Sequence, residues 1–291
     1  MSTQPTFWRE LADLPHALEY RQIGPWRTRV LTVGDGDGDG DETVVLLNGT
    51  TGHIEAFTKN VRALASRYRV VGYDYPGQGY TTLTDHDLEI PEYEAHLLAL
   101  LDDLGIASAH LIGESLGGWI AIKFAQHHPE RVRSLVLSAP GGRVIADGAM
   151  ARTRPVSSRA VEDPTFEHVK ERLAIVIHDP ALITDELVEV RRAIYSRPGF
   201  AATLPHLLAL QQPETRARHQ VTEADYAALP VPTLLVWTDH EPSGGVDLGR
   251  RLAEAIPDGE LLVIRDAAHW PQWEDSATFD ARALDFLGRQ A

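Results

Sequence analysis

The stretch "AHLIGESLGGWIAIKFAQHH", residues 109–128, decides the fold prediction. Its first five residues have the mostly apolar pattern of a buried strand, and the residues from Leu116 onward have the pattern of a helix. The turn between them, "GESLG", matches G-x-S-x-G, in which a sharp strand-to-helix turn exposes a serine. Gly113 and Gly117 are the small neighbours that a crowded turn requires, and the helix N-terminus brings N–H groups close to Ser115. We interpret Ser115 as a nucleophile; the alternative is a glycine-rich turn with an inert hydroxyl group.

Outward from this stretch, short β-branched runs alternate with helical patterns along most of the chain. Strands are predicted at 28–33, 43–48, 69–74, 109–113, 134–139, 233–237 and 261–265. Helices are predicted at 54–66, 92–104 and 116–128. Alternating strands and helices predict an α/β fold with a mostly parallel, twisted sheet, helices on both of its faces and right-handed crossovers.

The alternation stops between about residues 142 and 231, where several prolines and helical patterns occur without a convincing strand. Residues 184–195 and 204–211 are predicted to be helical. We therefore predict three segments. Residues 1–142 form the first part of an α/β core, residues 143–230 form a helical insertion, and residues 231–291 complete the core.

Composition restricts the class of protein. The 291 residues are 43% hydrophobic and 24% charged, as in globular proteins, and no apolar run approaches the ~18 residues of a membrane span. The formal net charge of −15 makes nucleic acid and anionic membranes poor partners, whereas a small anionic substrate stays compatible with it. The chain has no cysteine, which excludes disulfides, thiolate zinc sites and a cysteine nucleophile. Because the N-terminus lacks a signal-peptide pattern, we expect a cytoplasmic protein.

One repetitive segment, "GDGDGDGDE" at Gly34–Glu42, has the alternating aspartates of a calcium loop. An EF-hand loop requires a glutamate at its twelfth position, which is Leu46 when the count starts at Asp35. We therefore predict an exposed turn between two strands at this segment, with no metal site and no cofactor.

A serine nucleophile requires a base and an acid. His269 in "RDAAHWPQWED" directly follows a predicted buried strand near the chain end, where the base belongs in the order serine, acid, histidine. The alternative is a capping or surface histidine. The loop "TDHEPSGG" offers two acids, Asp239 and Glu241, and the residue pattern leaves both open.

An oxyanion hole is predicted from "LLNGTTGH", which follows an early strand. Gly49 allows the chain to turn, so that the N–H of Thr50 faces the site. The N–H of Leu116, directly after the nucleophile, is the second expected donor. The alternative is an ordinary turn at the end of a strand.

At these residues the sequence resembles the α/β-hydrolase superfamily over nearly its whole length. "HWPQWED" at His269–Asp275, "DYPGQGYT" at Asp74–Thr81 and "SLGGWIAIKFAQHHPERVRSLVL" are similar to the meta-cleavage product hydrolases, which break carbon–carbon bonds in aromatic degradation. The resemblance implies that the insertion is a lid. It also implies that Arg191, in "TDELVEVRRAIYSRPGF", binds a substrate carboxylate, and that the protein is a homodimer or larger assembly.

The resemblance also bears on the remaining site residues. The family acid lies four residues after the tryptophan of a W-G-x-x-D pattern, which from Trp237 gives Glu241. Trp270 and the lid would shape an apolar pocket, and Asn48 and Gly49 would contact the substrate. Two residues depart from the family pattern, since Glu114 stands where asparagine is usual and Asn48 stands where histidine is usual. A carboxylate at Glu114 would repel a substrate carboxylate if both lie inside the cleft.

These expectations favour a cofactor-free serine hydrolase that cleaves a carbon–carbon bond in 2-hydroxy-6-oxo-hexa-2,4-dienoate-type ring-cleavage products. An acyl-enzyme route and direct attack by water are both compatible with the residues. The first alternative is a carboxylesterase or lactonase on the same fold, slightly favoured by Glu114 and Asn48. The second is a hydrolase-like fold that serves as a ligand receptor without catalysis.

Overall fold

The computed structural model describes residues 6–34, 42–143 and 149–290 of the chain. Nearly all of the aspartate–glycine repeat falls in 35–41, so the predicted turn there lies outside the described residues. Within the described parts, no helix is both long enough and apolar enough to span a bilayer.

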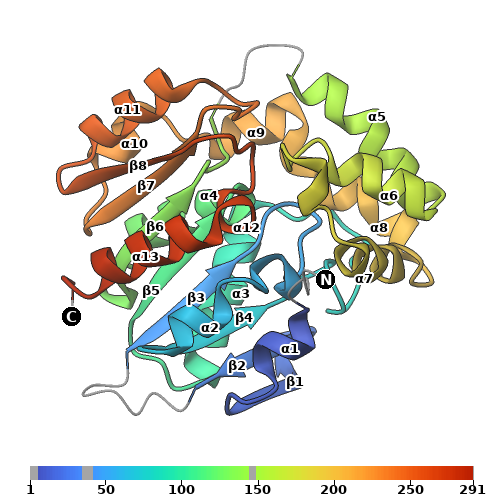
Figure 1. The fold of residues 1–291 in the computed structure, drawn as a ribbon, viewed down its shortest axis with the longest axis horizontal. Coiled ribbons are helices and arrows are strands. Elements are labelled where there is room, and N and C mark those ends of the chain that lie inside the picture. Colours follow the sequence, from blue (N-terminus) through green and yellow to red (C-terminus); the bar gives the residue numbers. More distant parts are fainter. Residues whose placement is uncertain (1–5, 35–41, 144–148, 291) are drawn as a thin grey trace.

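The strands of the described residues form one eight-stranded sheet in the order β1-β2-β4-β3-β5-β6-β7-β8 (Figure 1). The strands are β1 (His16–Ile23), β2 (Trp26–Val33), β3 (Thr43–Leu47), β4 (Arg69–Tyr73), β5 (Ala109–Glu114), β6 (Val132–Ser138), β7 (Thr233–Thr238) and β8 (Gly259–Ile264). All neighbours from β4 to β8 pair in parallel, whereas β1 with β2 and β2 with β4 are antiparallel. The predicted fold class is thereby confirmed.

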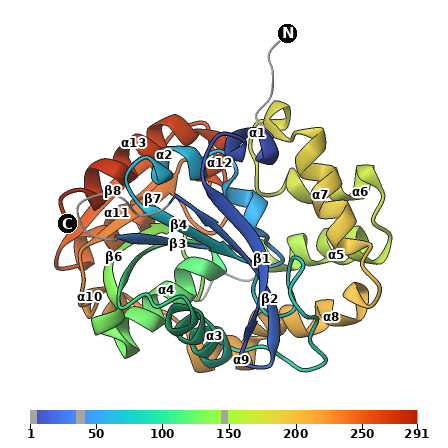
Figure 2. The same ribbon diagram turned by 90° about the horizontal axis from the view of Figure 1, so that it is seen from below.

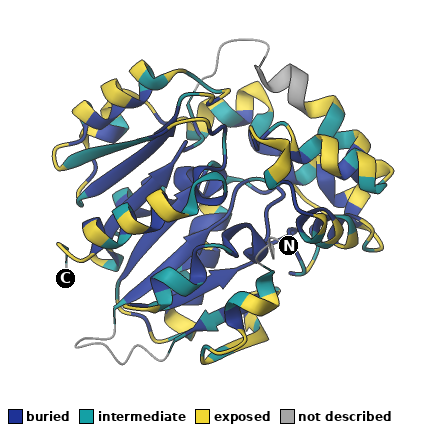
Figure 3. Cartoon of the chain, in the orientation of Figure 1, coloured by how far each residue is buried: buried dark blue, intermediate teal, exposed yellow. Residues whose placement is uncertain are grey.

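The central strands are buried on both faces, which explains their continuously apolar sequences. Every residue of β3, β5 and β7 is buried, and these strands form the dark centre of Figure 3. The prediction missed β1, whose residues are mostly exposed and show no apolar alternation. This strand exists because it pairs along its whole length with β2 in a hairpin that turns at Gly24, where φ is 55°.

Helices cover both faces of the sheet, with α2 and α13 on one face and α3 and α4 on the other (Figure 2). The helices outside the insertion are α1 (Phe7–Leu11), α2 (Val61–Ala65), α3 (Ile90–Asp103), α4 (Leu116–His127), α11 (Val246–Ala255), α12 (Pro271–Glu274) and α13 (Ser276–Leu287). The single helix predicted at 54–66 is wrong, because a 3₁₀ turn at Ile54–Phe57 precedes the short α2. Asn60 fixes the break by donating its side-chain amide to Gln272 O and to Asp280 Oδ1.

In the described part of the segment between β6 and β7 there are six α-helices, and α5 to α8 gather at one end of the sheet, on the right of Figure 1. They are α5 (Ala149–Glu162), α6 (Phe166–Leu173), α7 (Asp185–Tyr195), α8 (Phe200–Leu207), α9 (Pro213–His219) and α10 (Glu223–Ala227). Helix α7 matches the prediction at 184–195. The helix predicted at 204–211 is shifted, since α8 begins earlier and is followed by a separate 3₁₀ turn at Ala209–Gln211.

Candidate active site

Ser115 occupies the turn between β5 and α4 with φ 52° and ψ −112°, a backbone conformation that is costly for any residue other than glycine. Hydrogen bonds hold it there. Its N–H donates to Ser138 O at 3.0 Å, and its carbonyl accepts from Gly141 N at 2.8 Å and from Trp119 N at 3.0 Å. The surrounding structure thus fixes a strained serine at the carboxyl end of a central strand.

The glycines beside Ser115 are required by close backbone approach. A Cβ atom on Gly113 would lie 2.6 Å from the backbone carbon of Gly117, and a Cβ atom on Gly117 would collide with the carbonyl of Leu47 on β3. These contacts let α4 start directly above β3 and β5. The sharp strand-to-helix turn that the sequence predicted is therefore present in the structure.

His269 lies in the loop after β8 and contacts Glu241, the acid that the resemblance implied. His269 Nδ1 lies 2.8 Å from Glu241 Oε2, and Glu241 is only 6% exposed. Ser243 N donates to the other Glu241 oxygen at 2.9 Å. Burial alone would raise the pKa of Glu241, but the contacts with His269 and Ser243 outweigh burial and lower it. Glu241 is thus an ionised partner that orients the imidazole ring.

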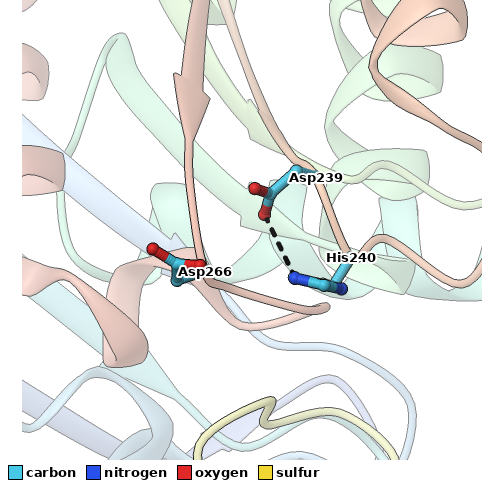
Figure 4. A group of neighbouring side chains, drawn as sticks. All are labelled: Asp239, His240 and Asp266. Carbon is cyan, nitrogen blue, oxygen red and sulfur yellow. Dashed lines mark ion pairs between the residues drawn. The ribbon is translucent and has the colours of Figure 1, made fainter.

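The second candidate acid, Asp239, faces a different direction. Figure 4 shows Asp239 beside His240 and Asp266, and its Oδ1 lies 4.0 Å from His240 Nε2. Backbone N–H groups of Asp266 and Ala267 donate to the Asp239 carboxylate and help to lower its pKa, although burial opposes this. Asp239 therefore joins the loops after β7 and β8 instead of contacting His269.

Glu114 lies on the opposite side of the same imidazole. Its Oε1 is 3.3 Å from His269 Nε2, its side chain is buried, and it accepts a hydrogen bond from Gly49 N–H. Burial would lower the pKa of His269, but the Glu241 and Glu114 carboxylates outweigh it and raise the pKa to about 9. Among the described residues, Ser115 Oγ makes no hydrogen bond. Burial raises the pKa of Glu114 itself, although His269 and the Gly49 N–H oppose this. Glu241, and to a smaller extent Glu114, thus favour the protonated form of His269.

A pocket of about 150 Å³ opens at this point, the kind of site that binds a small molecule. It brings together most of the predicted site residues, namely Ser115, Leu116, Glu241, His269, Trp270, Arg191, Gly49 and Thr50. Asn48 is the exception among them and does not line the pocket. Its side chain is buried, and its amide donates to Tyr73 O at 3.1 Å, so it ties the end of β3 to β4 instead of facing a substrate.

Arg191 is the cation predicted at the site, and it is buried with 1% exposure. Its Nη1 donates to the Tyr195 hydroxyl at 3.4 Å, and its guanidinium carbon lies 5.3 Å from the centre of the Trp270 ring. Its Nε and Nη2 find no partner among the described residues. A buried guanidinium without a carboxylate is costly, which indicates a place for an anionic ligand.

Three further arginines line the pocket that the sequence did not single out: Arg143, Arg172 and Arg216. Arg172 lies on α6, and burial together with the neighbouring Arg191 lowers its pKa. The sequence carries no clear signal for them, because arginines on amphipathic helices are usually solvated. Only the apolar neighbours of Arg172 in "RLAIVI" hint at a buried position.

Comparisons with known proteins identify the family of this chain. The model of the α/β-hydrolase fold family matches residues 42–166. A 2-hydroxy-6-oxononadienedioate/2-hydroxy-6-oxononatrienedioate hydrolase from Paraburkholderia phymatum is 32% identical over 262 residues, covering 85% of this chain and 88% of the relative. The protein of the same name from Burkholderia vietnamiensis is 32% identical over 264 residues, with 86% and 88% covered.

Solved structures of hydrolases also resemble this chain over nearly its whole length. A crystal structure of the meta-cleavage product hydrolase CumD has a TM-score of 0.78 and 25% identity, covering 94% of this chain and 98% of that one. The 2-hydroxy-6-oxo-6-phenylhexa-2,4-dienoate hydrolase from Rhodococcus has a TM-score of 0.80 at 20% identity, with 94% and 99% covered, and this likeness shows the shared fold. The chain is therefore a member of the α/β-hydrolase superfamily and belongs, within it, to the meta-cleavage product hydrolases.

Proposed function

We propose that this protein is a serine hydrolase that cleaves the carbon–carbon bond beside the ketone of 2-hydroxy-6-oxo-hexa-2,4-dienoate-type compounds, with Ser115, His269 and Glu241 as its triad. The observation that carries the proposal is the 2.8 Å contact between His269 and Glu241 in a pocket that also contains Ser115 and the buried Arg191. The relatives are named for substrates of this class, which supports it.

The chemistry follows from the positions of these groups. Arg191 binds the carboxylate of the dienoate and favours the keto tautomer, in which the leaving carbon can depart as a stabilised dienolate. His269 accepts the proton of Ser115, and Ser115 Oγ attacks the ketone carbon, while the N–H groups of Thr50 and Leu116 stabilise the oxyanion. His269 then protonates the departing carbon fragment. Water, deprotonated by His269, releases the carboxylic acid from Ser115. In this arrangement, the contact between His269 Nε2 and Glu114 must break before His269 can accept the proton of Ser115.

Residues 143–230 serve as a lid in this proposal, closing over a core made of residues 1–142 and 231–291. Side chains of this segment line the same pocket as Ser115, among them Ile175, Val176, Leu207 and Leu210. They would exclude water from the dienolate before it is protonated. A homodimer or larger assembly and a cytoplasmic location remain predictions of the resemblance and the composition.

One observation favours a second candidate function, a carboxylesterase or lactonase. The buried Glu114 carboxylate lies against Gly49, close enough that a Cβ on Gly49 would collide with it. A carboxylate in the pocket repels an anionic substrate and would suit a neutral ester better. Two arginines near Glu114, Arg172 and Arg191, offset this repulsion, so we retain the dienoate as the substrate.

The test follows the visible absorbance of alkyl and aryl 2-hydroxy-6-oxo-dienoates mixed with wild type and with Ser115→Ala. We expect rapid bleaching by the wild type alone. Slow bleaching together with fast cleavage of nitrophenyl esters would replace the proposal by the esterase. Failure of an active-site phosphonate to label Ser115 would support the non-catalytic ligand receptor.

A further inference from the structure

A strip of the insertion, residues 176–182 between α6 and α7, lies against the loop that carries His269. The N–H of His269 donates to Val176 O at 3.0 Å, so the backbone of the base itself is bonded to the insertion. Further along the strip, Trp273 Nε1 of α12 donates to Leu182 O at 2.8 Å. The strip is therefore attached to the core at the segment that contains the base.

The carboxylate of Glu274, the last residue of α12, joins the same two segments. Its Oε1 accepts the Ala268 N–H at 2.7 Å, and its Oε2 accepts the His178 N–H at 2.6 Å. The N–H of Trp270 interacts with it as well. Ala268 and Trp270 are the two neighbours of His269 along the chain, so one side chain holds the backbone on both sides of the base.

Glu274 binds backbone N–H groups rather than a cation. In the described parts of the chain it forms no ion pair, and Lys59, whose charge acts on it, donates instead to Trp273 O at 2.7 Å. Burial raises the pKa of Glu274, and the N–H groups of His178 and Ala268 oppose this by stabilising the ionised form. Two N–H groups require two acceptor oxygens, which a carboxylate has and a side-chain amide lacks.

The position of the His269 ring depends on this backbone, because a ring that contacts Glu241 at 2.8 Å tolerates little movement of its own Cα atom. The carbonyl of Ala268 is fixed as well, since Thr238 Oγ1 at the end of β7 donates to it at 2.6 Å. The loop that carries the base is thus held from two sides, by β7 and by α12.

We propose that Glu274 is a positioning residue for the reaction. It holds the backbone on both sides of His269, joins that backbone to the insertion at His178, and so keeps the imidazole where it can accept the proton of Ser115. This inference rests on the proposed function, because it takes His269 as the base.

The test compares Glu274→Gln and Glu274→Ala with the wild type, in dienoate turnover and in the rate at which a fluorophosphonate labels Ser115. Glu274→Gln leaves one acceptor oxygen for the two N–H groups, and Glu274→Ala leaves none. We expect kcat and the labelling rate to fall together, by about tenfold in Glu274→Gln and about 10²-fold in Glu274→Ala, with KM within about threefold. The rising limb of kcat/KM should also move to lower pH, because a displaced imidazole loses contact with Glu241, which raises the pKa of His269 against the effect of burial.

Trp273→Phe is the matched control, because it removes the hydrogen bond to Leu182 O between the same helix and the same strip, and leaves the N–H groups beside His269 with their acceptor. It should keep kcat and the labelling rate within about threefold of the wild type. Equal losses in Trp273→Phe and Glu274→Gln overturn the proposal, since attachment of the strip alone would then explain them.

The proposal is also overturned if Glu274→Gln has the circular dichroism spectrum of the wild type and both kcat and the labelling rate are unchanged. Labelling tests the positioning role independently of the substrate, because it requires Ser115 and His269 but no dienoate. Labelling of the wild type without bleaching of the dienoate rejects carbon–carbon hydrolysis, and slower labelling of Glu274→Gln then still supports the positioning role.

Discussion

Two acidic residues follow β7, and Glu241 alone contacts the imidazole of His269, at 2.8 Å. Glu241→Gln should keep the shape of the side chain but remove the charge that stabilises the imidazolium, so kcat should fall by about 10³–10⁴-fold. Asp239→Asn, which changes a carboxylate that faces His240, should lower kcat less than about fivefold. Steady-state kinetics on the dienoate measure both, and the reverse ranking would make Asp239 the acid.

Glu114 is the other carboxylate at His269, and its effect is visible in the pH dependence. With His269 at a pKa of about 9, the neutral base needed by Ser115 becomes abundant only at alkaline pH, so kcat/KM should rise with pH up to about 9. Glu114→Gln removes one of the two charges that stabilise the imidazolium. The rising limb of kcat/KM should then move to lower pH, by about one unit or more.

Profiles of kcat/KM between pH 5 and pH 10 give this shift, with Glu171→Gln on the exposed side of α6 as the control. A limb that stays in place in Glu114→Gln would mean that Glu114 carries no charge beside His269 in the free enzyme. The sequence predicted Ser115, His269 and Glu241 as a triad. All three line one pocket, and His269 contacts Glu241, whereas its Nε2 lies beside Glu114. The sequence could not predict that Glu114 reaches His269, because which way a side chain points beside a tight turn depends on packing against Gly49.

At the scale of elements, the sequence predicted seven strands, and all seven are present with ends shifted by a few residues. Most of these strands are buried, and β8 is half-buried, so an apolar run in the sequence indicates a strand with little contact with water. Strand β1 was missed because its pairing with β2 depends on backbone hydrogen bonds, which leave no periodic pattern in exposed residues. The helix predicted at 54–66 is interrupted by contacts of Asn60 with residues more than 200 positions away, which a local pattern cannot contain.

Helix α7 presents two adjacent arginines to opposite environments. Arg191 is buried at the pocket, whereas Arg192 is half-buried and pairs with Glu189 at 2.7 Å. Arg191→Ala should lower kcat/KM for the dienoate by about 10–100-fold, because a charge-assisted contact with the substrate carboxylate is lost. For a neutral nitrophenyl ester, Arg191→Ala should change kcat/KM by no more than about threefold. Arg192→Ala should leave both activities unchanged, and equal losses on the two substrates with Arg191→Ala would assign Arg191 a structural role.

At the scale of the whole molecule, charge is distributed unevenly. The chain is strongly acidic, yet the pocket holds four arginines without a described carboxylate partner. Net charge alone indicated that a small anion remained compatible, and the structure shows where it would be attracted. The sequence could not reveal this concentration, because Arg143, Arg172 and Arg216 come from three separate segments that only the folded insertion brings together. The predicted family, by contrast, is confirmed, since its motifs lie in contiguous stretches.

The stability of the whole chain should depend on pH through Asp280 on α13, which joins the last helix to the segment before α2. Asp280 is 7% exposed and accepts a hydrogen bond from the Asn60 amide at 2.8 Å. Burial raises its pKa to about 7, although Asn60 opposes this. Since an unfolded aspartate titrates near 3.9, the folded state binds more protons between about pH 4 and pH 7. The contribution of Asp280 to the free energy of unfolding is therefore present below about pH 4 and is lost as the pH rises to 7, by up to about 3–4 kcal/mol.

Asp280→Asn keeps the oxygen that accepts from Asn60 and removes the buried charge that forms at higher pH. Urea unfolding at pH 8 should show the variant to be more stable than the wild type by about 1–3 kcal/mol, and the gain should shrink at pH 5. Other titrating groups are shared by the two proteins and cancel in the difference. Asp285→Asn, an exposed change on the same helix, should show no such pH-dependent gain. If Asp280→Asn is instead less stable than the wild type at pH 8, the ionised carboxylate itself holds α13 against Asn60, and the link between the two ends of the core is electrostatic.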